Sequence, residues 1–241
     1  TQNRMVMSSV HFPALKGSRL NRDMASDIEK IIAEAMAANS TANLSRKPGE
    51  PVTTLGNPTE GATLLWLEDS GIDYLALREA FSLEKQWTFS TERKMMASYG
   101  LSGAGKEKIM YFKGAPELVL SKCSEILTDK GLQAIGIFSA KISEELRNQQ
   151  ARGMRTLGFA FLRGFDSAPD GDLQNIAHNL TWLGFVAIAD PIRPDVPMAL
   201  NVCRSAGVQV KVITGDNSNT AWEIANQIGL LDQGDVQNQV H

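Results

Sequence analysis

The chain has 241 residues, which is enough for one large domain or two smaller ones with a buried core. Hydrophobic residues make up 43%, charged residues 21% and the net charge is −3, which is ordinary for a globular protein and gives no sign of nucleic-acid binding. The two cysteines and three histidines have no disulfide-framework or zinc spacing, and no apolar run approaches the ~20 residues that span a bilayer.

Three helices and a loop are expected in the first 80 residues, after an extended segment at 1–12. Residues 22–40 place apolar side chains at helical spacing. The polar, Pro- and Gly-rich segment that follows predicts a loop. Asn57 then has the character of an N-cap, with Pro58 in the first turn and Glu60 as the capping-box partner that reaches back. A third, short helix is expected over 72–80.

Strands dominate the middle of the chain. Four segments rich in apolar and aromatic residues predict them: 85–100, 107–113, 154–163 and 182–190. A Gly-rich loop joins the first two, and we expect these to pair antiparallel. Pro116 opens a helix that reaches about Cys123, and a polar helix over 138–152 ends at Gly153.

The C-terminal part has a different pattern. Residues 194–207 predict a helix, 208–214 a buried strand and 217–229 another helix, which is the unit of a doubly wound parallel sheet. We therefore expect an α+β fold with an antiparallel sheet flanked by helices. A partial α/β, Rossmann-like segment of the haloacid-dehalogenase kind should follow it at the C-terminal end.

Thr214, Gly215 and Asp216 are the first group that could carry chemistry. They follow the predicted buried strand and precede a helix, at the edge where α/β sheets bind ligands. A hydroxyl, a glycine amide and a helix N-terminus together suit a phosphate group. Alternatively, Thr214 and Asp216 only cap a turn and a helix, and spacing alone favours that simpler interpretation.

A second group lies at the end of the last long strand. Asp190 ends the strand, and Pro191 and Pro194 stiffen the exit on either side of Arg193, as at a hinge. An ordinary strand end with a surface arginine explains the same residues, and without other information it is preferred.

Phe89, Lys94 and Lys113 form the third group. Five residues separate Phe89 from Lys94, so a regular strand would put them on opposite faces, and a shared pocket would need a bend or bulge. An exposed ring with several cations suits a nucleotide, whose base stacks while its phosphates meet the cations. The alternative, a core phenylalanine and solvated lysines, is about as well supported by the residues alone.

Six motifs in order resemble the cytosolic motifs of P-type cation-transporting ATPases: GNPTEGA (56–62), FSTERKMM (89–96), FKGAPE (112–117), RGMRTLGFA (152–160), DPIRPD (190–195) and VITGDN (212–217). The first residues, TQNRM, resemble the continuation of that family's phosphorylation motif Asp-Lys-Thr-Gly-Thr-Leu-Thr, with Thr1 as its last threonine. The resemblance is closest to the type II group. Asp-Pro-Ile-Arg stands where the family has Asp-Pro-Pro-Arg, and with GNPTEGA it favours calcium pumps of the plasma-membrane kind.

The resemblance implies a nucleotide-binding domain over 4–188, with 1–3 and 189–241 as hinge and partial phosphorylation domain. The implied nucleotide-binding residues are Glu60, Phe89, Lys94, Lys113, Gly114, Arg155 and Arg193. In the family Phe89 would stack on adenine, Lys94 would lie along the nucleotide and Lys113 would line the deep end of the pocket.

The remaining residues take supporting roles by the same resemblance. Glu60 would contact the adenine edge or a polar neighbour, and Arg155 would reach towards the phosphates. Arg193 would touch ribose or phosphate beside the hinge residues Asp190 and Pro191. The phosphoryl-site supports would be Thr214, Gly215 and Asp216.

The implied function is the ATP-binding cytosolic domain of an ATP-driven pump, which presents ATP, with Mg²⁺ in the whole protein, to a phosphorylated aspartate. That aspartate would lie six residues before Thr1, and the family's magnesium motif would follow His241. We therefore expect a soluble, monomeric piece of a longer membrane protein that binds adenine nucleotide weakly, binds no nucleic acid and does not hydrolyse ATP.

Two alternatives stay open. A haloacid-dehalogenase-type phosphohydrolase needs a nucleophilic Asp-x-Asp after an early strand, whereas the Asp-x-Asp of this chain, at residues 170–172, falls in a polar loop. The second alternative is a non-catalytic interaction module that has lost nucleotide binding. The retained residues Phe89, Lys94, Lys113 and Arg155 argue against it.

Overall fold

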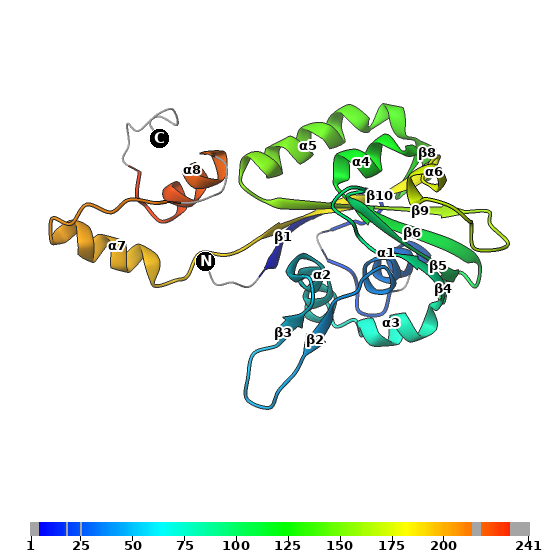
Figure 1. The fold of residues 1–241 in the computed structure, drawn as a ribbon, viewed down its shortest axis with the longest axis horizontal. Helices are drawn as coiled ribbons and strands as arrows, with labels where there is room; N and C mark the ends of the chain where they lie inside the picture. The colour runs from blue at the N-terminus through cyan, green and yellow to red at the C-terminus, as the bar shows by residue number, and fades with distance from the viewer. Residues whose placement is uncertain (1–4, 18, 25, 214–217, 232–241) are drawn as a thin grey trace.

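The central feature of the computed structural model, which describes residues 5–17, 19–24, 26–213 and 218–231, is an eight-stranded sheet (Figure 1). In spatial order its main path is β4 (Ser82–Trp87), β5 (Met95–Leu101), β6 (Lys108–Gly114), β9 (Arg155–Arg163), β10 (Leu180–Ala189), β7 (Cys123–Thr128) and β8 (Gly131–Ala134). The eighth strand, β1 (Val6–His11), pairs with β10.

The sheet is mixed rather than purely antiparallel. The predicted antiparallel pairing of β5 with β6 is confirmed, with Met95 opposite Gly114 and Leu101 opposite Lys108. However, β7 runs parallel to β10, so the expectation of an antiparallel sheet is wrong at that pair. The chain passes through β8, the 3-10 helix at Ile135–Ile137, a helix and β9 before it returns as β10, and only such a long connection permits parallel pairing.

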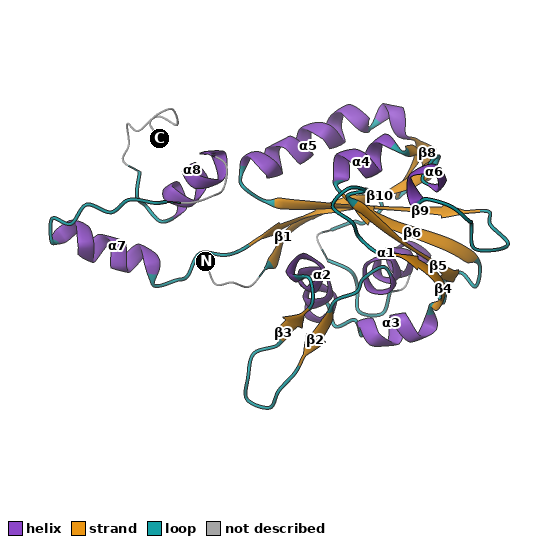
Figure 2. Ribbon diagram, in the orientation of Figure 1, coloured by secondary structure: helices purple, strands orange, loops and turns teal. Residues whose placement is uncertain are grey.

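Helices cover both faces of the sheet (Figures 1 and 2). One face carries α1 (Asp27–Ala38), α2 (Pro58–Asp69) and α3 (Tyr74–Ala80), and the other carries α4 (Pro116–Ser121), α5 (Ser139–Ala151) and α6 (Leu173–Ile176). A small hairpin of β2 (Asn43–Ser45) and β3 (Thr53–Leu55) projects beside α2. The predicted α+β class is confirmed in this coarse form.

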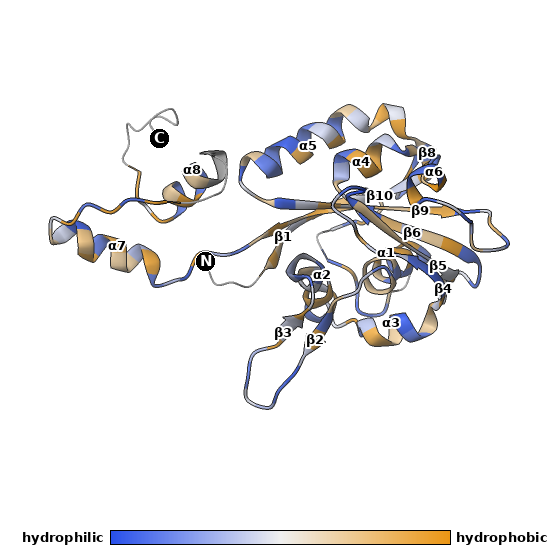
Figure 3. Cartoon of the chain, viewed as in Figure 1, coloured by the Kyte–Doolittle hydropathy of each residue, from blue (hydrophilic) through white to orange (hydrophobic). Residues whose placement is uncertain are grey.

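Two hydrophobic cores follow from this layering. Successive side chains of a strand point to opposite faces, so Tyr111 of β6 packs in the core under α1 to α3 while Phe112 packs in the core under α4 to α6. In Figure 3 the central strands are largely hydrophobic, whereas α5 carries many hydrophilic residues and buries only Ile142 and Leu146. The sheet is therefore the rigid element from which the loops of one end project.

The segment after β10 departs from the sequence expectation. Helices α7 (Val196–Ser205) and α8 (Ser218–Gln227) form as predicted, but residues 208–213 form no strand, and Ile213 is 96% exposed. A strand needs a neighbour for its backbone N–H and C=O groups, and the described part of the chain offers none beside this segment. The Rossmann-like segment stays a prediction, and Thr214, Gly215 and Asp216 lie outside the described residues. Among the described helices, none has the length and apolar character needed to cross a membrane.

Candidate functional site

A cavity of about 380 Å³ opens where the start of α2, the loop after β4, the end of β6 and the start of β9 meet. Six of the residues that the sequence analysis singled out line it: Glu60, Phe89, Lys94, Lys113, Gly114 and Arg155. These residues are spread over almost a hundred positions of the chain. The sheet brings them together because β6 and β9 are neighbours and β5 begins beside the end of β6.

The loop 88–94 places Phe89 and Lys94 on the same cavity. The predicted strand over 85–100 is two strands, and the residues between them form turns in which Lys94 N donates to Ser90 O (2.8 Å) and Arg93 N to Ser90 Oγ (3.1 Å). Lys94 has a φ of 49°, in the left-handed region. The bend thus removes the obstacle that regular strand geometry posed, and it leaves Phe89 53% exposed at the cavity.

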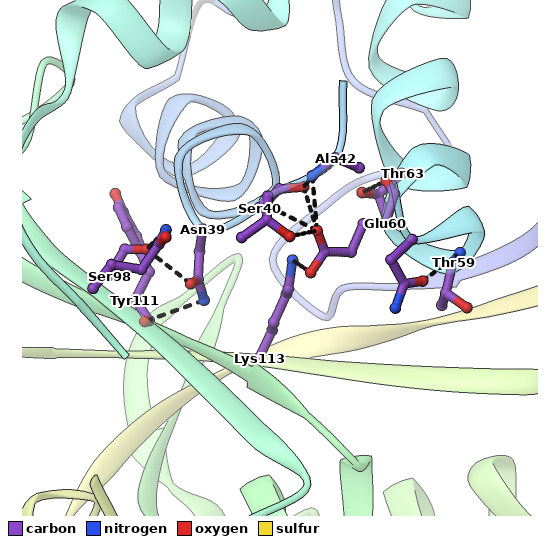
Figure 4. A network of polar contacts seen from close by, with 12 residues as sticks. Asn39, Ser40, Ala42, Thr59, Glu60, Thr63, Ser98, Tyr111 and Lys113 are labelled. Carbon is purple, nitrogen blue, oxygen red and sulfur yellow. Dashed lines mark hydrogen bonds and ion pairs between the residues drawn. The ribbon is translucent and has the colours of Figure 1, made fainter. Parts of the chain in front are cut away.

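Lys113 and Glu60 form a buried ion pair inside the cavity (Figure 4). Their residues are 3% and 5% exposed, and Lys113 Nζ lies 2.9 Å from Glu60 Oε1. The ammonium forms no well-aligned hydrogen bond within the described part of the chain. Its remaining N–H donors are therefore available to a ligand that enters the cavity.

Glu60 does not close a capping box, so that expectation is wrong. Asn57 does cap α2, because its Oδ1 accepts from Thr59 N (2.9 Å). The Glu60 carboxylate turns instead towards the segment after α1. Its Oε2 accepts from Ser40 Oγ (3.0 Å), Thr41 N (2.7 Å), Thr41 Oγ1 (3.0 Å) and Ala42 N (3.0 Å). A buried carboxylate with that many donors is strongly held in its ionised form.

The pKa values of the pair are displaced in the same direction for different reasons. Burial alone would raise the pKa of Glu60, but the ion pair with Lys113 and hydrogen bonds from Thr41 and Ser40 lower it to about 2. Burial lowers the pKa of Lys113 to about 8, although Glu60 opposes this effect. At neutral pH both groups are charged, so the cavity holds a desolvated cation whose partner is fixed.

Gly114 and Arg155 shape the rim of the cavity. A Cβ at Gly114 would lie 2.3 Å from the backbone oxygen of Lys94, so no larger residue fits between β5 and β6 at this point. Arg155 begins β9 with an exposed side chain and forms no ion pair with any described residue. It therefore adds a further cation to the lining of the cavity.

Arg193 lies away from this cavity. Its guanidinium binds the exposed Asp195, with Nε to Oδ1 at 3.1 Å and Nη2 to Oδ2 at 2.6 Å. Asp190 and Arg155 line a neighbouring cavity of about 510 Å³, where Asp190 Oδ1 is buried without a hydrogen-bond partner among the described residues. Pro191 lies in the connection from β10 to α7, as the predicted hinge requires, but no observed geometry tests the hinge.

The sequence analysis missed the turn Ser40–Ala42, which holds Glu60, and the cavity-lining residues Thr59, Thr91, Thr156 and Leu157. Asn39 and Ser40 fall in the helix expected over 22–40 and Thr41 in the loop expected after it, and nothing in the sequence connects them with a carboxylate about twenty positions later. Among the described residues no group of three or more His, Cys, Asp or Glu converges as a metal site would require. The residues described here therefore do not fit a Mg²⁺ centre.

Comparison with known proteins gives consistent matches. The family model for the P-type ATPase cytoplasmic domain N matches residues 27–195. The chain is 31% identical over 224 residues to the calcium-transporting ATPase PAT1 of Dictyostelium discoideum, which covers 92% of this chain and 20% of that protein. It is 35% identical over 225 residues to plasma membrane calcium-transporting ATPase 4 of Bos taurus, covering 88% of this chain and 18% of that protein. It thus spans about a fifth of the length of these relatives.

Proposed function

The chain belongs to the P-type ATPase family, in which it matches the cytoplasmic domain N, and from this premise we propose that its cavity binds an adenine nucleotide. The observation that carries the proposal is the meeting of an exposed ring, Phe89, with a buried ammonium, Lys113, at one cavity. An aromatic face suits the adenine ring, and cations suit the phosphates. No acid or nucleophile in the described cavity is placed for bond cleavage.

Each side chain has a role under this proposal. The base stacks on Phe89, and Lys113 at the enclosed end donates to an acceptor of the nucleotide while Glu60 keeps it in place. Lys94 and Arg155, which also line the cavity, neutralise phosphate charge along the ligand. Gly114 allows β5 and β6 to approach closely beside the cavity, because any side chain there would meet the backbone of Lys94. The nucleotide is bound and oriented without being hydrolysed by this chain.

We also propose that the whole protein is a calcium-transporting P-type ATPase, in which residues 4–188 form the nucleotide-binding domain. The support is that the relatives are named calcium-transporting ATPases and match this chain over most of its length. The domain would present ATP to an acceptor carboxylate outside the chain, and Asp190, Pro191 and Arg193 would lie at the hinge. Phosphoryl transfer depends on Mg²⁺ to neutralise charge, and that metal would be held elsewhere in the whole protein.

Isothermal titration with ATP tests the nucleotide proposal. We expect saturable binding, weakened about tenfold or more by Phe89→Ala, because one stacked base contributes ~1–3 kcal/mol. Leu132→Ala on β8 is the matched control, since Leu132 is also 53% exposed but lies at the far edge of the sheet. Undiminished binding by Phe89→Ala would remove the stacking assignment.

The two other functions make different predictions in the same experiments. A non-catalytic interaction module would bind no ATP even at millimolar concentration. A phosphohydrolase would turn over a generic phosphate ester, and nothing in the described cavity favours that reaction.

A further inference from the structure

The side chain of Arg78, on α3, contacts the turn that holds Glu60, although Arg78 does not line the cavity. Its guanidinium donates Nε to Ala37 O (2.7 Å), Nη1 to Asn43 Oδ1 (2.8 Å), and Nη2 to Ala42 O (2.8 Å) and Ser40 O (3.3 Å). One side chain therefore binds the whole segment from the last turn of α1 to the start of β2. Only the planar, multi-donor fork of arginine can make this set of bonds together.

The segment needs such a partner because it follows a helix end. The last carbonyl groups of α1 have no intrahelical donor, and Arg78 Nε supplies one to Ala37 O. The carbonyls of Ser40 and Ala42 point to Arg78, while Ser40 Oγ and Ala42 N point to Glu60 Oε2. The turn thus has the guanidinium on one side and the carboxylate on the other.

A second anchor ties the same turn to the sheet (Figure 4). Asn39 Nδ2 donates to Tyr111 O (3.2 Å), and Asn39 Oδ1 accepts from Ser98 Oγ (3.0 Å). Tyr74 of α3 adds to the contact from the helix side, since its hydroxyl accepts from Leu44 N (3.0 Å) and its ring lies 5.0 Å below the guanidinium carbon of Arg78. The turn is therefore fixed between α3 and the sheet that carries Lys113.

Charge couples Arg78 to the ion pair as well. Burial lowers the pKa of Arg78, and the electrostatic interactions with Tyr74 and Glu60 oppose that effect without cancelling it. The charge of Arg78 in turn acts to lower the pKa of Lys113. The Glu60 carboxylate thus interacts with two cations, Lys113 and Arg78, and the turn fixes its position.

We propose that Arg78 is a positioning residue of the nucleotide cavity: through the turn Ser40–Ala42 it fixes the Glu60 carboxylate, which in turn fixes the ammonium that Lys113 presents to the ligand. This inference takes its ligand, an adenine nucleotide, from the proposed function. The hydrogen bonds of Arg78 on which it is based do not depend on that function. Arg78 itself touches no nucleotide.

The first test is a double-mutant cycle read by ATP titration. Arg78→Lys keeps the charge and loses the fork, and we expect it to weaken ATP binding about five- to tenfold, whereas Arg147→Lys on the exposed side of α5 should not. In a Glu60→Gln background the effect of Arg78→Lys should fall to about twofold or less, because the group through which Arg78 acts is already altered. An equal loss in both backgrounds, or no loss in the first, overturns the proposal.

The second test needs no nucleotide. The pKa of Lys113 is followed by the chemical shift of its 13C-labelled Cε in the unsubstituted chain and in Arg78→Lys. Because the cation at position 78 is kept, only the support from Glu60 changes, and the pKa should fall below about 8. A pKa that is unchanged or higher overturns the proposal, even in a chain that binds ATP normally.

Failure of the two proposals can be told apart. If the unsubstituted chain binds no ATP while the pKa of Lys113 falls in Arg78→Lys, the nucleotide proposal fails and the positioning role stands. Should Arg78→Lys fail to fold, Asn43→Ala removes a single exposed acceptor of the same guanidinium. It should shift the pKa of Lys113 in the same direction by a smaller amount, and an upward shift would count against the role.

Discussion

Replacing Lys113 by methionine should not destabilise the fold, whereas replacing Glu60 by glutamine should. The two residues form one buried ion pair, and loss of either partner from such a pair ordinarily costs about 3–5 kcal/mol. Here the partners are unequal. Glu60 keeps the donors of Ser40, Thr41 and Ala42 when Lys113 is gone, while the Lys113 ammonium has only Glu60 to offset its burial.

The magnitudes follow from the pKa values. Burial lowers the pKa of Lys113 from 10.5 to about 8, so keeping the ammonium charged inside the fold costs about 3 kcal/mol below pH 8. Against the effect of burial, Lys113 and the hydrogen bonds lower the pKa of Glu60 from 4.5 to about 2, so its ionised form stabilises the fold by about 3 kcal/mol above pH 4.5. Lys113→Met removes the cost of the ammonium but also the part of the Glu60 stabilisation that Lys113 supplies, so it should leave the free energy of unfolding unchanged or slightly raised, whereas Glu60→Gln should lower it by about 3 kcal/mol.

The pH dependence of stability tests independently whether Lys113 destabilises the fold and Glu60 stabilises it. A cation whose pKa is lowered by folding destabilises the native state fully below its folded pKa, and this cost disappears as the pH rises from about 8 to 10.5. The stability of the unsubstituted chain relative to Lys113→Met should therefore rise over that range. The stabilisation from Glu60 should be lost as the pH falls from 4.5 to about 2.

Urea denaturation followed by circular dichroism at pH 7 and pH 10 measures the effect of Lys113, and the same assay at pH 7 and pH 3 measures the effect of Glu60. A loss of about 2 kcal/mol or more in Lys113→Met at pH 7 would refute the reasoning, because it would show that the pair stabilises the fold through both partners. If the expected result is obtained, Lys113 is retained at a cost to stability, which is what a ligand-binding cation should show.

Two further substitutions probe the close packing at Gly114, beside the cavity, and the N-terminal cap of α1. Gly114→Ala places a Cβ 2.3 Å from Lys94 O and should destabilise the fold by ~1–3 kcal/mol in urea denaturation. Gly136→Ala is the control and should be neutral, because nothing lies within 4 Å of a Cβ there. Equal effects of the two substitutions would contradict the steric argument. Ser26→Ala breaks the capping box in which Ser26 Oγ accepts from Glu29 N (3.2 Å), and calorimetry should show about 1 kcal/mol of lost stability. No change there would mean that α1 does not depend on its cap.

The elements that local pattern predicted well are those with strong boundaries. Helix α2 begins at Pro58 after the Asn57 cap and α4 begins at Pro116, because proline at the first helical position marks the start. Strands β9 and β10 are within two residues of their predicted ends, since long apolar runs next to turn residues leave little choice. The strand expected over 208–214 failed where no neighbouring strand exists to bond with it in the described residues.

The resemblance to P-type ATPases, drawn from six short motifs, is confirmed by the family match. Glu60 shows where prediction from a local motif fails. The spacing Asn57-Pro58-Thr59-Glu60 is that of a capping box, yet the carboxylate leaves its own helix for the turn after α1. Local spacing describes what a side chain can reach within its helix, and the more numerous donors of a distant turn outweigh the single backbone N–H at the cap.

The sequence by itself determined the family, the helices and strands with clear boundaries, and six of the residues around one cavity. Only the tertiary structure decided that Phe89 and Lys94 share that cavity, because the direction of a side chain depends on the turn at 88–94 and not on its position in a strand. It also decided that Lys113 is buried against Glu60 and that Arg78 supports them from outside. Burial and charge partners arise from which segments the sheet and helices bring together, and that long-range packing is not written in local spacing.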